Sequence, residues 1–237
     1  MNSATQPPTS ITVQGGTKRY GENTVFENIS VAFQLGTYTT LTGPNGSGKS
    51  TLLSCILGQE LFTEGKLFLG DQEVLPGNTQ YAQQVFGIND SIGWLPGLTV
   101  GQHLELLHRN SAHIPQQTAT ELLSPQDALD QLGVPQDWDR EPYSLSSGQE
   151  QRARLASLLI RDATYFFLDE PEKRLDTDGV QWVAQWSQQR VNAGAMVCIA
   201  THDATLNSLN STNNLRFPLD ARSSAEPLTE HAHQARQ

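Results

Sequence analysis

Hydrophobic and polar stretches alternate along this chain in a way that predicts an α/β fold. Apolar runs short enough for strands cover residues 11–13, 25–33, 38–42, 85–88, 165–168, 195–200 and 215–219. Apolar residues recur at helical spacing over 50–57, from 99 to about 109, after 149 and over 180–191. Turn residues, among them Gly15, Gly16, Gly21 and Asn23, separate the first strands. We therefore expect one large α/β domain.

The middle of the chain departs from this alternation. Two short strands, 66–69 and 72–74, flank Gly70-Asp71, and residues 118–132 are predicted to be helical with a break at Ser124-Pro125. Residues 88–162 thus form a predicted helical subdomain, inserted into a core of residues 10–87 and 163–220. Residues 1–9 and 221–237 are polar and predict disordered ends around the folded unit 10–220.

The strongest motif is Gly-Pro-Asn-Gly-Ser-Gly-Lys-Ser-Thr at residues 43–51, between a predicted strand and a predicted helix. Gly43, Gly46 and Gly48 lack a Cβ, so the backbone can turn its N–H groups toward a phosphate. Lys49 can reach the outer phosphates, and the Ser50 hydroxyl is a ligand for Mg²⁺. This segment predicts a nucleotide triphosphate site, whereas an ordinary glycine-rich turn would need no lysine.

Two acids end a buried strand of aromatic and apolar residues. Asp169 and Glu170 follow residues 165–168, where carboxylates are costly unless they are used. Asp169 could hold Mg²⁺ and Glu170 could deprotonate the attacking water, although a surface turn would also place acids here. A lone histidine after a strand is more often structural, but His202 ends an apolar strand that could lie beside the one that ends in Glu170, so it is a candidate sensor of the γ-phosphate.

Two further segments are weaker signals on their own. Residues 145–149, Leu-Ser-Ser-Gly-Gln, precede a predicted helix and form a second candidate anion site, or an ordinary helix cap. Tyr20 could stack on a purine ring or simply cover a hairpin. Trp94, Leu95 and Leu98 form an apolar cluster that is either a docking surface or local core packing.

The amino-acid composition limits the kinds of partner and the cellular compartment that we expect for this protein. The formal net charge is −10, which argues against a broad nucleic-acid-binding surface, so no nucleic acid is expected. The two cysteines, Cys55 and Cys198, are expected to be buried thiols in a reducing compartment. No apolar run is long enough to span a bilayer, and the N-terminus lacks a signal-peptide core. We expect a cytoplasmic protein whose membrane role, if any, comes through a partner.

Taken together, the motifs resemble the nucleotide-binding subunit of ATP-binding cassette (ABC) transporters over residues 10–219. Residues 43–51 resemble the Walker A loop, 145–149 the family signature, 165–170 the Walker B strand with the catalytic glutamate, Leu175-Asp176 the end of the D-loop, and His202 the switch histidine. The resemblance implies a P-loop NTPase fold of the ABC type, with an antiparallel β subdomain and an inserted helical subdomain. It implies catalytic roles for Glu170, His202 and Lys49.

The resemblance also implies the ligands and partners. ATP would contact Tyr20, Gly43, Asn45, Gly46, Ser47, Gly48, Lys49, Ser50, Thr51, Ser146, Ser147, Gly148, Gln149 and Asp176, and Mg²⁺ would contact Ser50, Asp169 and Asp90. Two such subunits, identical or different, would close around ATP and drive a transmembrane permease from the inner face of the cell membrane. The compact layout favours export. The alternatives are a soluble ABC ATPase that acts in assembly or repair, and a weakly hydrolysing regulatory module.

Five residues, in three segments of the chain, depart from the family pattern. Asp90 stands at or near the position of the Q-loop glutamine, which alters the charge balance at the metal site. Glu172-Lys173-Arg174 replaces the small polar residues usual in the D-loop, so dimer contacts are expected to differ. Ser147 replaces a glycine but keeps its backbone N–H group. The regulatory alternative is disfavoured by the retention of Lys49, Asp169, Glu170 and His202.

Overall fold

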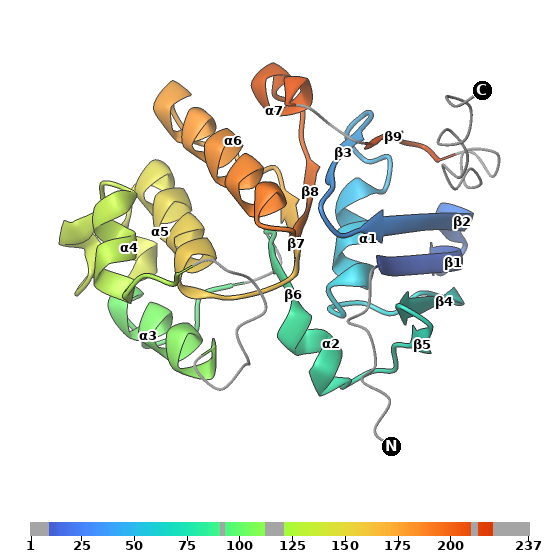
Figure 1. Ribbon diagram of the computed structural model, residues 1–237, viewed down its shortest axis with the longest axis horizontal. Helices are drawn as coiled ribbons and strands as arrows, with labels where there is room; N and C mark the ends of the chain where they lie inside the picture. The colour runs from blue at the N-terminus through green and yellow to red at the C-terminus, as the bar shows by residue number, and fades with distance from the viewer. Residues whose placement is uncertain (1–9, 91–92, 112–120, 210–212, 220–237) are drawn as a thin grey trace, which may run out of the picture.

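The computed structural model describes residues 10–90, 93–111, 121–209 and 213–219. These residues form two sheets with helices packed around them (Figure 1). The disorder predicted for residues 1–9 and 221–237 concerns positions outside the described residues.

The first sheet is antiparallel and has the strand order β2-β1-β4-β5. Its strands are β1 (Ser10–Tyr20), β2 (Asn23–Gln34), β4 (Glu64–Leu69) and β5 (Gln72–Glu73). The turn predicted at Gly15-Gly16 is wrong, because β1 continues through these residues with shifts in its pairing to β2 and β4. Gly15 has a φ of 62°, a left-handed conformation that glycine adopts easily and that is typical of a bulge.

The second sheet is parallel and has the order β6-β7-β8-β3-β9. Its strands are β3 (Tyr38–Thr42), β6 (Val85–Ile88), β7 (Tyr165–Asp169), β8 (Met196–Ala200) and β9 (Asn213–Arg216). The strand predicted over 215–219 is thus shifted toward the N-terminus. All five strands run the same way, so the loops that follow them share one edge of the sheet.

Helices surround the parallel sheet (Figure 1). They are α1 (Lys49–Ile56), α2 (Thr79–Gln84), α3 (Val100–Ser111), α4 (Pro125–Gln131), α5 (Ser147–Ile160), α6 (Thr177–Asn192) and α7 (Ala204–Ser208), with short 3₁₀ turns at Pro135–Asp137 and Pro142–Ser144. The helix predicted from 118 does not include residues 121–124. Ser124 is extended and its side chain accepts a hydrogen bond from the Asp127 N–H, so it caps α4 and prevents an earlier start.

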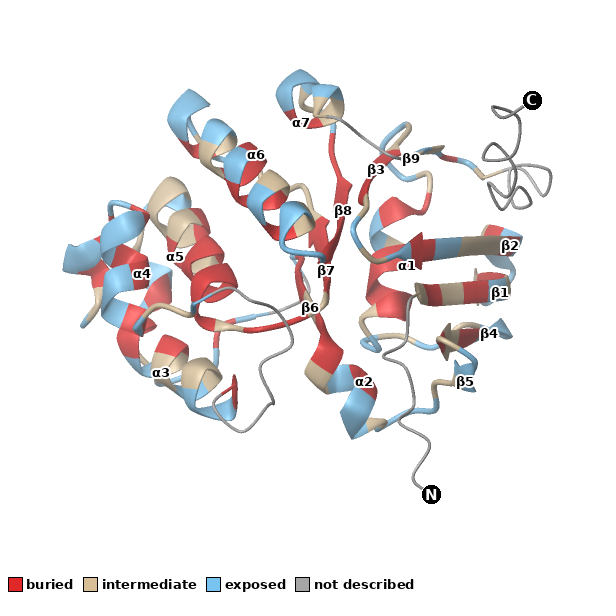
Figure 2. Ribbon diagram, viewed as in Figure 1, coloured by how far each residue is buried: buried red, intermediate tan, exposed pale blue. Residues whose placement is uncertain are grey.

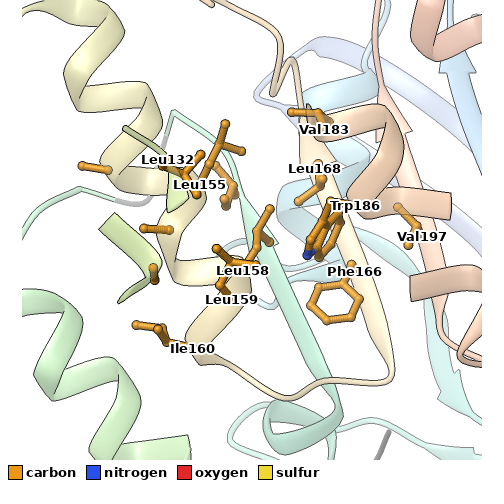
Figure 3. Packing of buried hydrophobic residues seen from close by; sticks show 14 of the residues in the cluster. Leu132, Leu155, Leu158, Leu159, Ile160, Phe166, Leu168, Val183, Trp186 and Val197 are labelled. Carbon is orange, nitrogen blue, oxygen red and sulfur yellow. The ribbon is translucent and has the colours of Figure 1, made fainter. Parts of the chain in front are cut away.

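Two hydrophobic clusters lie on opposite faces of the parallel sheet. One contains α3, α4, α5 and α6, with Phe166 and Leu168 from β7 (Figure 3). The other contains α1, α2 and the antiparallel sheet, with Tyr165 and Phe167 from β7. Alternate side chains of β7 therefore point into both clusters, which is why this strand is buried throughout its apolar length (Figure 2).

Candidate functional site

The glycine-rich loop between β3 and α1 surrounds the Lys49 side chain. Lys49 is buried, and its Nζ donates hydrogen bonds to the carbonyl oxygens of Gly43, at 2.8 Å, and Pro44, at 3.0 Å. The same Pro44 oxygen accepts the Ser47 N–H at 3.3 Å. The loop thus folds around its own lysine, and the cation is held where the chain turns into the first turn of α1.

Backbone geometry explains the glycines of this loop. Gly43 has a φ of 137°, and a Cβ there would lie 2.4 Å from the Phe217 carbonyl oxygen. Gly48 has a φ of 102°, and a Cβ there would lie 3.0 Å from the Val25 side chain. The Ser47 hydroxyl is buried and has no hydrogen-bond partner within the protein. A buried hydroxyl without a partner is costly, so an added acceptor such as a phosphate oxygen fits this position.

The acid at the end of β7, Asp169, has a buried oxygen, Oδ1, without a hydrogen-bond partner within the protein. Burial raises the pKa of Asp169, and the nearby carboxylates of Glu170 and Asp90 raise it further. A hydrogen bond from Ser50 and the charge of Lys49 lower the pKa. A buried carboxylate oxygen next to a serine hydroxyl is a donor set that suits Mg²⁺.

Glu170 and His202 come from neighbouring strands. The Glu170 N–H donates to the Ala200 carbonyl oxygen of β8 at 2.8 Å, so the turn after β7 stays paired with β8. Glu170 Oε1 then lies 3.9 Å from His202 Nε2. Glu170 has a φ of 45°, a conformation that is strained for a residue with a side chain. The structure therefore brings these two predicted site residues together.

Asp90 follows β6 and has a partner that the sequence did not reveal. Its Oδ2 lies 2.9 Å from Lys173 Nζ, and Lys173 Nζ is 3.7 Å from Glu170 Oε2. The hydrogen bond and charge of Lys173 lower the pKa of Asp90. Asp90 would therefore have to release Lys173, at least in part, to approach a metal ion.

The segment 145–149 begins α5 with a complete capping box. The Ser146 side chain accepts the Gln149 N–H, and the Gln149 side chain accepts the Ser146 N–H. Ser147 and Gly148 form the first turn of α5, where N–H groups lack partners within the helix. Helix α5 packs on one face of β7 and α1 on the other. The start of α5 and the glycine-rich loop are thus separate surfaces of one chain.

Helix α5 is also tied to the turn after β7. Gln151 Nε2 donates to the Pro171 carbonyl oxygen at 2.8 Å, and a Cβ on Gly148 would lie 3.2 Å from the Arg174 carbonyl oxygen. Asp176 caps α6 by accepting the Gly179 N–H, and it pairs with Arg152 Nη2 at 2.6 Å. Asp176, a predicted nucleotide contact, therefore has a structural role within this chain.

Tyr20 is the last residue of β1 and lies near the start of the molecule's first helix. The residue is 49% exposed, its hydroxyl donates to the Glu60 carboxylate, and Lys18 Nζ lies 4.8 Å from the ring centroid. This hydrogen bond raises the pKa of Tyr20 to about 12, with a smaller hydrogen bond to Thr51 acting the other way. An anchored and half-exposed aromatic ring is available for stacking.

The apolar cluster near residue 94 divides in two. Trp94 is buried, with its Nε1 donating to Glu150 Oε1 at 3.2 Å, so it is core packing. Leu95 is 46% exposed and lines a mostly apolar pocket of about 260 Å³ with Phe86, Leu104 and Leu107. The core-packing alternative is thus confirmed for Trp94, and a docking role for the exposed Leu95 stays a prediction.

The sequence singled out Glu172 and Lys173 only as altered dimer contacts and did not show their roles at the site. Glu172 accepts hydrogen bonds from the Thr201 hydroxyl and, at 3.1 Å, from the His202 N–H, so it fixes the backbone of the histidine. The signal was present in the sequence, since Glu172 and Lys173 are charged where the resembled family has small polar residues. What the sequence did not show was which loops they would reach.

Known proteins resemble this chain in sequence. The family described as ABC transporter matches residues 26–173. The SkfA peptide export ATP-binding protein SkfE of Bacillus subtilis is 29% identical, over 80% of this chain and 77% of its own length. The spermidine/putrescine import ATP-binding protein PotA of Roseobacter denitrificans is 34% identical, over 71% of this chain and 46% of its own length. The maltose/maltodextrin import ATP-binding protein MalK of Escherichia coli is 32% identical, over 82% of this chain and 52% of its own length. The chain thus spans about half the length of these import proteins.

Solved structures share the fold. A dimeric bacterial ABC transporter cassette superposes with a TM-score of 0.73 at 22% identity, over 87% of this chain and 94% of that one. A post-hydrolysis state of such a cassette, bound to ADP and Pi, superposes with a TM-score of 0.71 at 20% identity, over 87% of this chain and 94% of that one. Within the described residues, every helix is too short or too polar to cross a bilayer. The fold class expected from the sequence is confirmed, and the chain belongs to the ABC transporter family as an ATP-binding subunit with ATPase activity.

Proposed function

We propose that this chain drives transport through a separate transmembrane permease by closing on a second cassette subunit, identical or different, when ATP binds. The arrangement of the two helix starts supports this. Helices α1 and α5 pack on opposite faces of β7, so the first turn of α5 is a surface of its own. Ser146, Ser147, Gly148 and Gln149 would then face the ATP held by the loop of the other subunit.

Within one subunit, ATP would occupy the loop between β3 and α1. The phosphates would contact the N–H groups of residues 43–51, which include Asn45, Gly46, Ser47 and Thr51, and would draw Lys49 away from its two carbonyl partners. The unpaired Ser47 hydroxyl would gain an acceptor. Tyr20 would stack on the adenine, since its ring is half exposed and anchored by Glu60.

Ser50 and Asp169 would hold Mg²⁺, because the Asp169 carboxylate interacts with the Ser50 hydroxyl and its buried Oδ1 atom has no hydrogen-bond partner within the protein. When bound, Mg²⁺ supplies positive charge to the β- and γ-phosphates. Asp169 must stay ionised for this role although burial raises its pKa, so the positive charges of Lys49 and of the cation would favour its carboxylate form.

The observation that carries the catalytic proposal is the convergence of Glu170 and His202. Their side chains approach to 3.9 Å at the ends of adjacent strands β7 and β8. Glu170 would accept a proton from the water that attacks the γ-phosphate. His202 would donate to the γ-phosphate and so register whether it is present. Lys49 would stabilise the charge on the transferred group.

The membrane subunit would dock on the pocket beside Leu95. Its walls are apolar, formed by Phe86, Leu104 and Leu107, with Arg154 among the lining residues. A short amphipathic helix from a cytoplasmic loop of the permease is the occupant that we propose, since it could bury an apolar face there while Arg154 keeps its ion pair with Glu150. Docked in this way, the chain would act at the inner face of the cell membrane. We propose export as the direction, as named for the B. subtilis relative.

Replacement of Glu170 by glutamine tests this function. Glu170→Gln removes the proton acceptor and keeps the shape of the side chain, so turnover should fall roughly 10²- to 10⁴-fold. ATP affinity should remain, and an ATP-bound dimer should accumulate in size-exclusion chromatography because hydrolysis no longer opens it.

Glu73→Gln is the matched control. Glu73 makes the same type of exposed ion pair, with Lys66 on the antiparallel sheet, and its replacement should leave turnover unchanged. Undiminished hydrolysis in Glu170→Gln would exclude Glu170 as the base.

A further inference from the structure

Two charged residues extend in different directions from the turn that carries Glu170. The strands β6, β7 and β8 lie side by side in the sheet (Figure 1). Glu172 and Lys173 follow β7, and each contacts the loop after a different neighbouring strand. The two contacts connect three consecutive strand ends, with Glu170 in the middle.

The contact of Glu172 is with the β8 side. One oxygen, Oε1, accepts both the Thr201 hydroxyl and the His202 N–H. The Thr201 hydroxyl also accepts the Asp203 N–H at 3.0 Å, so the whole segment 201–203 is organised around this carboxylate. The second oxygen of Glu172 is buried without a partner, which places the group in a largely enclosed position. Hydrogen bonds to a charged acceptor are stronger than those between neutral groups.

The contact of Lys173 is with the β6 side. Its Nζ lies 2.9 Å from Asp90 Oδ2 and 3.7 Å from Glu170 Oε2, so one ammonium group lies between the two carboxylates. The side chains of Lys173 and Asp90 are 43% and 75% exposed, so the pair adds little to overall stability. Its effect is local: it limits where the Glu170 carboxylate can move.

We propose that Glu172 and Lys173 are positioning residues for ATP hydrolysis, which hold Glu170 between the ends of β6 and β8. Glu170 needs such support, because its φ of 45° is unfavourable and persists only where the surroundings constrain it. The histidine, the base and Asp90 would then keep fixed mutual positions while ATP binds. This inference rests on the proposed role of Glu170 as the base.

The test combines each replacement with Glu170→Gln. Glu172→Ala and Lys173→Met should each lower kcat about tenfold, because a displaced base works less well, and should leave the affinity for a fluorescent ATP analogue unchanged. In the Glu170→Gln background, single-turnover hydrolysis should show no further loss, because the group being positioned is gone. Glu172→Gln should retain most activity, since its amide oxygen can still accept both hydrogen bonds.

A structural readout accompanies the kinetics. Amide hydrogen exchange at His202 should accelerate in Glu172→Ala and stay slow in Glu172→Gln, because the His202 N–H loses its acceptor only in the first. Lys66→Met, at an ion pair with Glu73, is the control for Lys173→Met and should leave kcat unchanged.

The outcomes separate the two ideas. An additive loss in the Glu170→Gln background, a parallel fall of nucleotide affinity and kcat, or an unchanged kcat in both single variants would overturn the positioning role. Failure of the proposed function would instead appear in Glu170→Gln alone, as hydrolysis at the normal rate.

Discussion

Gly43 offers the sharpest test of how this loop is built. The change is Gly43→Ala, which adds one methyl group. Gly43 has a φ of 137°, where residues with a Cβ are strained by roughly 1–3 kcal/mol. The new Cβ would also lie 2.4 Å from the Phe217 carbonyl oxygen, and the nearest Phe217 side-chain atom is at 3.0 Å. A backbone atom cannot give way cheaply, so overpacking adds about 1–3 kcal/mol.

The two effects together predict that Gly43→Ala lowers the free energy of unfolding by roughly 2–6 kcal/mol. Phe217 is buried, and its N–H donates to the Thr42 carbonyl oxygen, so a shift of Phe217 would disturb the edge between β3 and β9. Urea unfolding followed by tryptophan fluorescence would measure the change. If the slope of the free energy of unfolding against urea concentration is unaltered, the variant exposes the same surface on unfolding, and the change is one of stability alone.

Gly46→Ala is the matched control in the same loop. Gly46 has a φ of 77°, but nothing lies within 4 Å of its Cβ position, so only backbone strain of about 1–2 kcal/mol applies. Equal destabilisation in the two variants would refute the idea that close approach to Phe217 explains the glycine at position 43.

Two further predictions concern packing and strain. Burial raises the pKa of Cys55 to about 11 and that of Cys198 well above its usual value. Neither thiol should therefore react with a thiol reagent at pH 8 until the protein unfolds, after which both should react. Rapid labelling of the native protein would contradict the burial. Arg174→Gly should raise the free energy of unfolding, measured in urea, by ~0.5–1 kcal/mol, because Arg174 has a strained φ of 67° and its 3.7 Å contact with Glu150 is partly exposed and weak. Arg174→Ala keeps the strained backbone, so an equal gain in that variant would show that strain is not the cause.

Much of the site could be predicted from the sequence because the residues that form it lie close together along the chain. The glycine-rich loop, the strand before it and Lys49 lie within a dozen residues, so one motif describes them. The position of His202 beside Glu170 was also anticipated, since both end apolar strands, and the structure pairs β7 with β8. These predictions required only the residues at the ends of two strands and the assumption that the two strands are neighbours in the sheet.

What could not be predicted depends on contacts between distant segments. The partners of Glu172 and Lys173 are separated from them by 30 and 83 residues, and no local pattern specifies such contacts. Helix α2 was missed because its six residues, Thr79–Gln84, include too few apolar positions to show a period; its start depends on the Asn78 side chain, which accepts the Tyr81 N–H.

The ties between α5 and the turn after β7 have a mechanical consequence. Gln151 donates to the Pro171 carbonyl oxygen, Arg152 pairs with Asp176, and Glu150 Oε2 lies 3.7 Å from Arg174 Nη1. Three attachments within two helical turns leave little room for sliding, so these segments should travel as one piece. A neighbour that presses on the beginning of α5 would therefore tilt the support of Glu170 directly. In the proposed dimer, this would couple the two ATP sites without a relay of intermediate residues.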